Sequence, residues 1–347
     1  MGLKRGGVST INHYWRIQFI ALVLLFVSFA IAIVTGAVSV SLIDWYRGWR
    51  DPAVSTQAEL IVQSIRVPRV LLAATVGAIL ASSGAVMQGL FRNPLADPSL
   101  IGVTAGASAG GSVMIVITAS FAGTFSTLWL ISLGAFAGGI VAVSLVYQLA
   151  TRNGVTSVAT MLLAGIAITA LVSSLTGTLE FFSGNDVLRR ISVWKMGGLD
   201  GANYSRLVVI VIIGISFFVV MPRYSSALNA LLLGESEARY LGFNVERTKR
   251  VLIVMVAAVV GVSVAMAGTI AFVGLVVPHI ARLLIGPNHQ RLIPLSAVIG
   301  AVLLLVADTL ARTLVSPAEL PVGLVTAVVG APFFISLLNK RRDFGLA

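Results

Sequence analysis

The sequence predicts an all-α, polytopic membrane protein with about ten transmembrane helices. Hydrophobic residues make up 57% of the 347 positions and charged residues only 11%, whereas soluble domains carry about 25% charged residues. The apolar fraction matches roughly ten spans of ~20 residues, the length that crosses a bilayer core. The absence of cysteine excludes disulfides, thiolate zinc sites and iron–sulfur clusters.

Charge-free runs locate the spans, because a charge at mid-membrane costs ~2.5–3.5 kcal/mol. The first run is too long for the apolar core of a cleaved signal peptide and is read as a span. Two longer runs each hold a pair of spans, one pair joined by a turn near Phe121–Phe125 and the other split at Gly268. The runs are Ile17–Ile43, Val70–Phe91, Pro98–Thr151 (two spans), Asn153–Leu179, Leu207–Pro222, Val251–Ala281 (two), Leu292–Leu314, which Asp308 and Arg312 interrupt, and Leu320–Asn339.

Between the spans there is no room for a soluble domain. The longest polar stretches, Asp44–Arg69, Glu180–Arg206 and Arg223–Arg250, are each shorter than about 30 residues. Residues 1–347 are therefore predicted to form a single transmembrane domain. The phosphate-binding pattern G-x-x-x-x-G-K-[ST] does not occur, so any ATP hydrolysis of that type must take place on another subunit.

The net charge of +11 divides unequally between the two membrane faces. Ten spans put both termini on one side, and cytoplasmic loops hold the excess of Lys and Arg. With both termini cytoplasmic, 15 of the 24 basic residues lie inside. Nine on the outer face exceed what orientation requires, so we expect an acidic partner to dock there. These nine are Arg47, Arg50, Arg66, Arg69, Arg189, Arg190, Lys195, Arg206 and Arg312.

Glycines at four-residue spacing mark two of the spans. Gly102, Gly106 and Gly110 follow one another in the third span, and Gly134 and Gly138 repeat the spacing in the fourth. Small residues at this spacing let helices approach closely. Tight packing is the favoured interpretation, and a sliding or gating helix is the alternative.

The second span opens on Arg66-Val67-Pro68-Arg69, and a turn-forming motif, Arg92–Pro98, follows its end. The two prolines of this motif stop the helix, and its Asn and Asp side chains can bond freed backbone groups. The run R-V-P-R…G-A-V-M-Q-G-L-F-R-N-P-L-A-D-P-S-L-I-G-V-T-A-G-A resembles the FecCD-type permeases of ABC importers for iron complexes and cobalamin. The resemblance continues in W-x-M-G-G-L (194–199), L-L-L-G-E-S-E-A-R-Y-L-G (231–242), G-T-I-A-F-V-G-L-V-V-P-H-I-A-R (268–282) and A-E-L-P-V-G-L-V-T-A-V-V-G-A-P-F-F (318–334).

The resemblance implies a type II ABC importer permease in the bacterial inner membrane, with both termini cytoplasmic. The chain would be a transport subunit and not an enzyme, with no cofactor of its own, because ATP and Mg belong to a partner. The implied partners are a second permease copy in a homodimer, two ATP-binding subunits, a periplasmic substrate-binding protein and the lipid bilayer. No nucleic acid is expected to bind.

The polar segment 223–250 mixes leucines with charges around Gly234, which predicts two short amphipathic helices on the membrane surface. The resemblance implies that this segment couples the permease to the ATPase subunit. Apolar residues flanked by charges suit a helix-in-groove contact. The residues that match the coupling motif are Gly234, Glu235, Ala238, Leu241 and Gly242.

Three outer arginines match positions where related permeases meet acidic residues of the binding protein: Arg66, Arg69 and Arg312. The alternative for Arg312 is an internal pair with Asp308, four residues before it on the same helical face. The alternative for Arg66 and Arg69 is an interfacial arginine that extends its side chain toward water.

The translocation path has a weaker signal, because the spans that line it in this family carry almost no charge here. Met87, Gln88, Asn93 and Leu95 match positions near the gate. His279 and His289 invite a metal or haem-ligand interpretation, but without a second nearby ligand a hydrogen-bonded structural role is favoured for His279.

Cargo and mechanism are left with alternatives. The resemblance favours haem, then a ferric siderophore, then cobalamin. An ion-coupled secondary transporter would need a titratable group within the membrane, and Asp308 is the only acidic residue in a predicted span. An intramembrane enzyme is disfavoured, because no nucleophile–base pair or metal cluster is found in the sequence.

Overall fold

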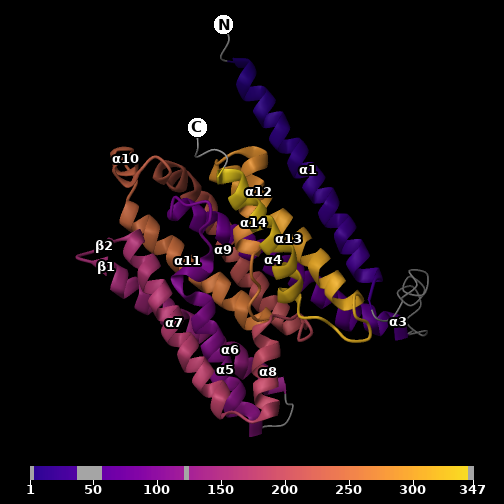
Figure 1. Ribbon diagram of the computed structural model, residues 1–347. Coiled ribbons are helices and arrows are strands. Elements are labelled where there is room, and N and C mark those ends of the chain that lie inside the picture. The colour runs from indigo at the N-terminus through magenta and orange to yellow at the C-terminus, as the bar shows by residue number, and fades with distance from the viewer. Residues whose placement is uncertain (1–3, 37–56, 121–124, 343–347) are drawn as a thin grey trace.

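The protein is a bundle of apolar helices. The computed structural model describes residues 4–36, 57–120 and 125–342 (Figure 1). Seven helices in these ranges are long and apolar enough to cross a membrane, and three shorter apolar helices accompany them. Each predicted span therefore corresponds to a helix, and the fold class of a multi-pass, all-α membrane protein is confirmed.

The amino-terminal half of the bundle contains four spanning helices and several short connecting elements. Its elements are α1 (Lys4–Val34), α3 (Gln57–Leu60), a π-helix (Ile61–Arg66), α4 (Val67–Leu90), two 3₁₀ turns (Pro98–Ile101 and Thr118–Ser120), α5 (Val103–Ile117), α6 (Phe125–Ala150) and the hairpin β1 (Thr151–Arg152) and β2 (Val155–Thr156). The first predicted span beyond residue 36, Arg47, Arg50 and most of the turn near Phe121–Phe125 lie outside the described residues.

The carboxyl-terminal half contains the other six spans and two short helices. Its elements are α7 (Val158–Phe182), α8 (Asn185–Lys195), α9 (Tyr204–Leu231), α10 (Glu235–Tyr240), α11 (Val245–Ala267), α12 (Val273–Ile285), α13 (His289–Thr313) and α14 (Val322–Arg342). The beginning of α1, the end of α14 and α10 lie toward one end of the bundle, and α3 and α8 lie toward the other (Figure 1).

Two predicted boundaries in this half are wrong. Helix α9 does not end at Pro222 but continues to Leu231, since transmembrane helices tolerate proline. As a result, segment 223–250 is not two surface helices. It consists of the end of α9, the short helix α10 and the first turn of α11.

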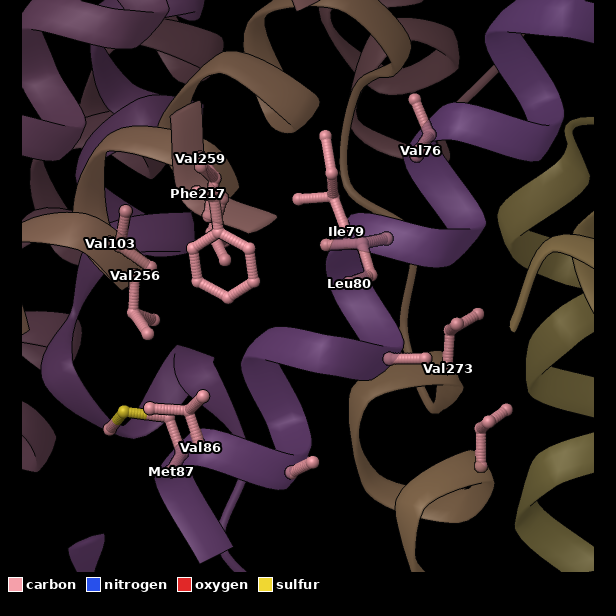
Figure 2. Packing of buried hydrophobic residues seen from close by; sticks show 14 of the residues in the cluster. Val76, Ile79, Leu80, Val86, Met87, Val103, Phe217, Val256, Val259 and Val273 are labelled. Carbon is pink, nitrogen blue, oxygen red and sulfur yellow. The ribbon is translucent and has the colours of Figure 1, made fainter. Parts of the chain in front are cut away.

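Helix α4 forms the centre of the bundle. Most of its apolar window is buried, whereas few residues in the windows of α1 and α7 are buried. Figure 2 shows α4 side chains surrounded by residues from α5, α9, α11 and α12. The labelled residues are Val76, Ile79, Leu80, Val86, Met87, Val103, Phe217, Val256, Val259 and Val273.

Glycines set the closest helix contacts. A Cβ atom at Gly106 would overlap the carbonyl oxygen of Gly138, and one at Gly110 would overlap that of Gly134. The tight packing of α5 on α6 is therefore confirmed. Gly102 is not part of this face, because it precedes α5 in the left-handed region with φ 78°, a conformation that glycine adopts without strain.

Candidate functional site

An open groove of about 440 Å³ lies where α5, α7 and α12 meet the segment between α11 and α12. Hydroxyl groups line much of it, and two charged side chains, Asp97 and Lys195, stand at its edge. Its lining residues are Asp97, Ser99, Thr104, Ala105, Ser108, Ser173, Thr176, Lys195, Thr269, Ile270, Ala271, Phe272 and Leu275.

The segment from Gly268 to Phe272 is not helical. Its two end residues, Gly268 and Phe272, have positive φ of 66° and 68°. Helix α12 follows with 13 residues, about 20 Å at 1.5 Å per residue, which is less than the bilayer core. Non-helical backbone at membrane depth occurs only where it is buried in protein or lines a water-filled cavity. Residues 269–272 of this break line the open groove, as that rule requires of non-helical backbone at membrane depth.

The two charges at the groove are both held by neighbours. Lys195 Nζ donates to Glu180 Oε1 at 2.9 Å, and Glu180 lies in the last turn of α7. The expectation that Asp308 is the only acidic residue in a span is therefore wrong. Asp97 Oδ1 accepts from the backbone N–H of Ser99 at 2.9 Å. Burial raises the pKa of Asp97 above its ordinary value, and the bonds to Ser99 only partly oppose this.

The four predicted gate residues do not line this groove. Met87 and Gln88 are buried in α4, and the Gln88 side chain bridges to α12 by donating to Leu275 O at 3.1 Å. Asn93 is exposed in the connection after α4, where its Oδ1 accepts from the N–H of Leu95 at 3.0 Å. Their gate role stays a prediction.

The predicted coupling residues surround α10. Gly234 and Gly242 flank it with φ 141° and 87°, conformations that favour glycine on both sides of a short helix. Ala238 is buried against the bundle, whereas Tyr240 is 91% and Leu241 60% exposed. The segment thus presents apolar side chains away from the protein at the end of the bundle that also holds the beginning of α1.

The three predicted docking arginines are buried, each 6% exposed or less. Arg66 Nη1 donates to Ile33 O and Val34 O, both at 2.7 Å. Arg312 donates to Ala32 O at 3.0 Å and Thr35 O at 3.1 Å. The two guanidinium groups therefore cap the carboxyl end of α1, where the last carbonyls lack helical partners and the dipole favours cations.

Asp308 joins two of these arginines. Its Oδ1 lies 3.0 Å from Arg69 Nε, and its Oδ2 lies 3.0 Å from Arg312 Nε. Arg69 also donates to Glu319 Oε2 at 2.8 Å. The internal pair between Asp308 and Arg312 is confirmed, and Asp308 is 0% exposed.

A second open pocket, of about 500 Å³, lies at the α8 end of the bundle beside Arg69, Trp194 and Glu319. Two adjacent arginines of α8, Arg189 and Arg190, line it and are exposed. No helix was predicted in this polar stretch. Val187, Ile191 and Trp194, spaced i, i+4 and i+7, are the signal that could have found it.

The histidines have structural surroundings. His289 is buried at the start of α13, where its N–H and its Nδ1 lie 2.8 and 2.9 Å from Asn229 Oδ1. His279 is buried in α12. Within the described ranges, no three His, Cys, Asp or Glu residues stand together in a way that could hold a metal ion.

Comparison with known proteins gives one consistent family. The model of the FecCD transport family matches residues 24–340. Two relatives have similar identity: the hemin transport system permease HmuU of Yersinia pestis, 45% over 280 residues (81% of this chain, 83% of that one), and the cobalamin import system permease BtuC of Halobacterium salinarum, 43% over 291 residues (83% and 76%).

Two further comparisons extend over almost the whole chain. The Fe(3+)-citrate import system permease YfmD of Bacillus subtilis is 38% identical over 329 residues, 93% of this chain and 94% of that one. Among solved structures, an inward-facing ABC transporter of metal-chelate type is 33% identical with a TM-score of 0.83, covering 94% of this chain and 99% of the other.

Proposed function

This chain belongs to the FecCD transport family, and from that premise we propose that it is the membrane permease subunit of an ATP-driven ABC importer for an iron complex or cobalamin. The observation that carries the proposal is the exposed apolar surface around α10, formed by Leu233, Tyr240 and Leu241. A short helix with exposed apolar residues between charges suits a groove on a partner. The partner proposed is the ATP-binding subunit, which would hold the ATP and Mg.

The orientation follows from the same assignment. If ATP-binding subunits seat on α10 in the cytoplasm, the beginning of α1 and the end of α14 are cytoplasmic too, because they lie at the same end of the bundle. The α8 end then faces outward. For a bacterial importer this corresponds to the inner membrane.

A second copy of the chain is the proposed partner for the exposed face of α7. Helix α1 exposes large apolar side chains such as Phe19 and Phe26, as a lipid-facing helix does. Helix α7 also exposes large apolar side chains such as Leu171, but its exposed face includes Ser173, Gly177 and Thr178 as well, small and hydroxylated residues that suit helix–helix contact or a wet path. Two copies facing each other across α7 would close the groove into a channel.

We propose haem as the first cargo to test, with a ferric siderophore and cobalamin as alternatives. Relatives named for hemin, cobalamin and Fe(3+)-citrate lie within a narrow range of identity. The hydroxyl-lined groove suits a bulky amphipathic molecule that passes without being held tightly, and it carries no charge pattern that selects among the three.

The test is uptake into proteoliposomes that contain the permease and its ATP-binding subunits, with binding protein on the outer side. We expect haem to accumulate in the liposomes only when ATP, the ATP-binding subunits and the binding protein are all present. Cargo that is taken up by the permease alone under a proton gradient would contradict the proposal and favour a secondary transporter. Parallel assays with a ferric siderophore and with cobalamin decide the cargo, since the three are distinguished by their visible spectra.

The binding protein is proposed to dock at the α8 end. Arg189 and Arg190 are the exposed basic pair there, whereas the arginines expected from the resemblance lie buried beneath this face. An acidic partner surface would be attracted by both sets, and rim charges mainly set the association rate.

Reversing both α8 charges tests this docking site. The double variant Arg189→Glu, Arg190→Glu should raise the binding-protein concentration for half-maximal stimulation of ATPase activity, on the order of tenfold at low salt and less at high salt. The charge-preserving double variant with lysine at both positions is the matched control and should stay within about twofold. An equal concentration requirement in both double variants would reject docking on α8.

A further inference from the structure

Four charged side chains form a closed ring between α10 and α11, and the lysine at its inner side is the subject of this inference. Lys249 Nζ lies 2.8 Å from Glu235 Oε2 and 3.2 Å from Glu246 Oε1. Arg239 Nη2 lies 3.1 Å from Glu246 Oε1 and 3.7 Å from Glu235 Oε2. Each cation therefore contacts both carboxylates. Two of these pairs, Lys249–Glu235 and Arg239–Glu246, join α10 to α11.

A third element enters the ring through Lys249. Its Nζ donates to Thr156 O at 2.8 Å. The N–H of Thr156 in turn donates to Glu246 Oε2 at 2.9 Å. Thr156 ends the hairpin between α6 and α7. The ammonium group thus directs its three donors to α10, α11 and the hairpin, which is the whole donor capacity of a lysine.

The two cations of the ring differ in burial. Lys249 is 1% exposed, whereas the Arg239 side chain is 53% exposed. Exposed ion pairs are screened and contribute little, while a buried charge that loses its partner is strongly unfavourable. Without Lys249, the partly buried carboxylates of Glu235 and Glu246 would keep only the exposed Arg239 as a counter-charge, so the inner cation carries the link between the elements.

We propose that Lys249 is a positioning residue that makes α10, the β1–β2 hairpin and α11 move as one rigid unit when an ATP-binding subunit displaces α10. The inference rests on the proposed function, because that function supplies the ATP-binding subunit that would displace α10. It assigns Glu235 an internal role in the ring, in place of direct contact with the ATPase.

Both helices that leave this unit reach the groove. From Lys249 to Gly268, α11 spans about 28 Å at 1.5 Å per residue, and Gly268 opens the non-helical segment of the groove. From Ser157, whose side chain accepts from the N–H of Thr160, α7 leads to Ser173 and Thr176 on the opposite wall. A displacement at α10 would therefore be passed to both walls together.

The first experiment compares Lys249→Met with Arg239→Met, two variants that remove a cation from the same ring. With the ATP-binding subunits bound, Lys249→Met should lower the cargo transported per ATP hydrolysed on the order of tenfold, within the range seen for residues that couple distant sites. ATP hydrolysis and co-purification of the ATP-binding subunit should be retained. Arg239→Met should stay within about twofold, and Lys249→Arg should restore most of the ratio, since it keeps the charge.

An unchanged transport ratio in Lys249→Met would overturn the proposal, as would an equal loss in Arg239→Met. If Lys249→Met does not fold, Glu235→Gln removes one charge of the ring without changing its shape, and the same fall in the ratio is expected. Loss of transport in step with loss of folded protein in both variants would make Lys249 a stability residue only, against the proposal.

A second measurement tests the rigid unit without any ATPase. The sequence has no cysteine, so spin labels can be placed at Ser236 of α10 and Val254 of α11, both exposed. The distance distribution between the labels should be narrow in the otherwise unaltered permease and broad in Lys249→Met. A narrow distribution in both would refute the link itself, whereas a broad one in Lys249→Met alone, with no ATP-dependent uptake in the unaltered complex, would refute the proposed function only.

Discussion

Replacing Asp308 with leucine is expected to remove most of the folded permease, at a cost of about 3–5 kcal/mol or more. The carboxylate lies 3.0 Å from both Arg69 Nε and Arg312 Nε and is fully buried. Leucine would leave two guanidinium groups in the interior with one carboxylate fewer between them. The midpoint of thermal unfolding of the purified protein in detergent measures the effect.

The control for this prediction is Asp308→Asn, which keeps a hydrogen-bond acceptor and should lose less stability. Its uptake per folded molecule should persist and remain dependent on ATP, because the residue holds structure and does not carry protons. A double variant of Asp308→Leu with Arg69→Met should be less destabilised than the sum of its single variants. Additive effects, or an Asp308→Leu variant as stable as the unaltered chain, would show that the pairs contribute nothing.

The substitution Gly84→Ala is expected to be the second most damaging change, although it adds one methyl group. A Cβ atom at Gly84 would overlap the carbonyl oxygen of Gly274, so α4 and α12 would have to separate along their backbones. Overpacking of this kind typically costs about 1–3 kcal/mol. Because α12 carries one side of the groove, ATP-dependent uptake per folded molecule should fall together with the unfolding midpoint.

Gly177→Ala is the matched control, since the same methyl group meets no atom of this chain within 4 Å in α7. Both variants are compared as monomers in detergent, because Gly177 lies on the proposed contact face with a second copy. Its stability should be unchanged or raised by up to about 1 kcal/mol, because alanine favours helix more than glycine does. Equal midpoints for Gly84→Ala and Gly177→Ala would mean that α4 and α12 are not packed as closely as the structure shows.

The spans were predictable because one physical cost dominates them. Charges are so unfavourable in a bilayer that runs with few or no charges mark the spans. The run 251–281 was divided at Gly268 because it is too long for one span. Helix α8 and the extension of α9 beyond Pro222 were missed because they lie partly outside such runs. There, helix formation depends on amphipathic spacing and on packing against the bundle.

The site was less predictable because its contacts join residues far apart in the chain. The pair of Asp308 with Arg312 follows from a spacing of four, but the pair of Asp308 with Arg69 crosses 239 positions. The same holds for Lys249 and Thr156, separated by 93 positions. An excess of outer arginines indicated an acidic partner, and the structure shows that the acidic groups of Asp308 and Glu319 meet two of them, Arg69 and Arg312, inside the chain.

The arginines that cap α1 also determine when this helix can be fixed in place during synthesis of the chain. Arg312 bonds Ala32 O across 280 positions, and at a synthesis rate of roughly 5–20 residues per second the ninth span emerges roughly 14 to 56 seconds after the first. During that interval the last carbonyls of α1 lack one of their two capping groups, the Arg312 guanidinium. The first of the described helices is therefore among the last to be fixed in place.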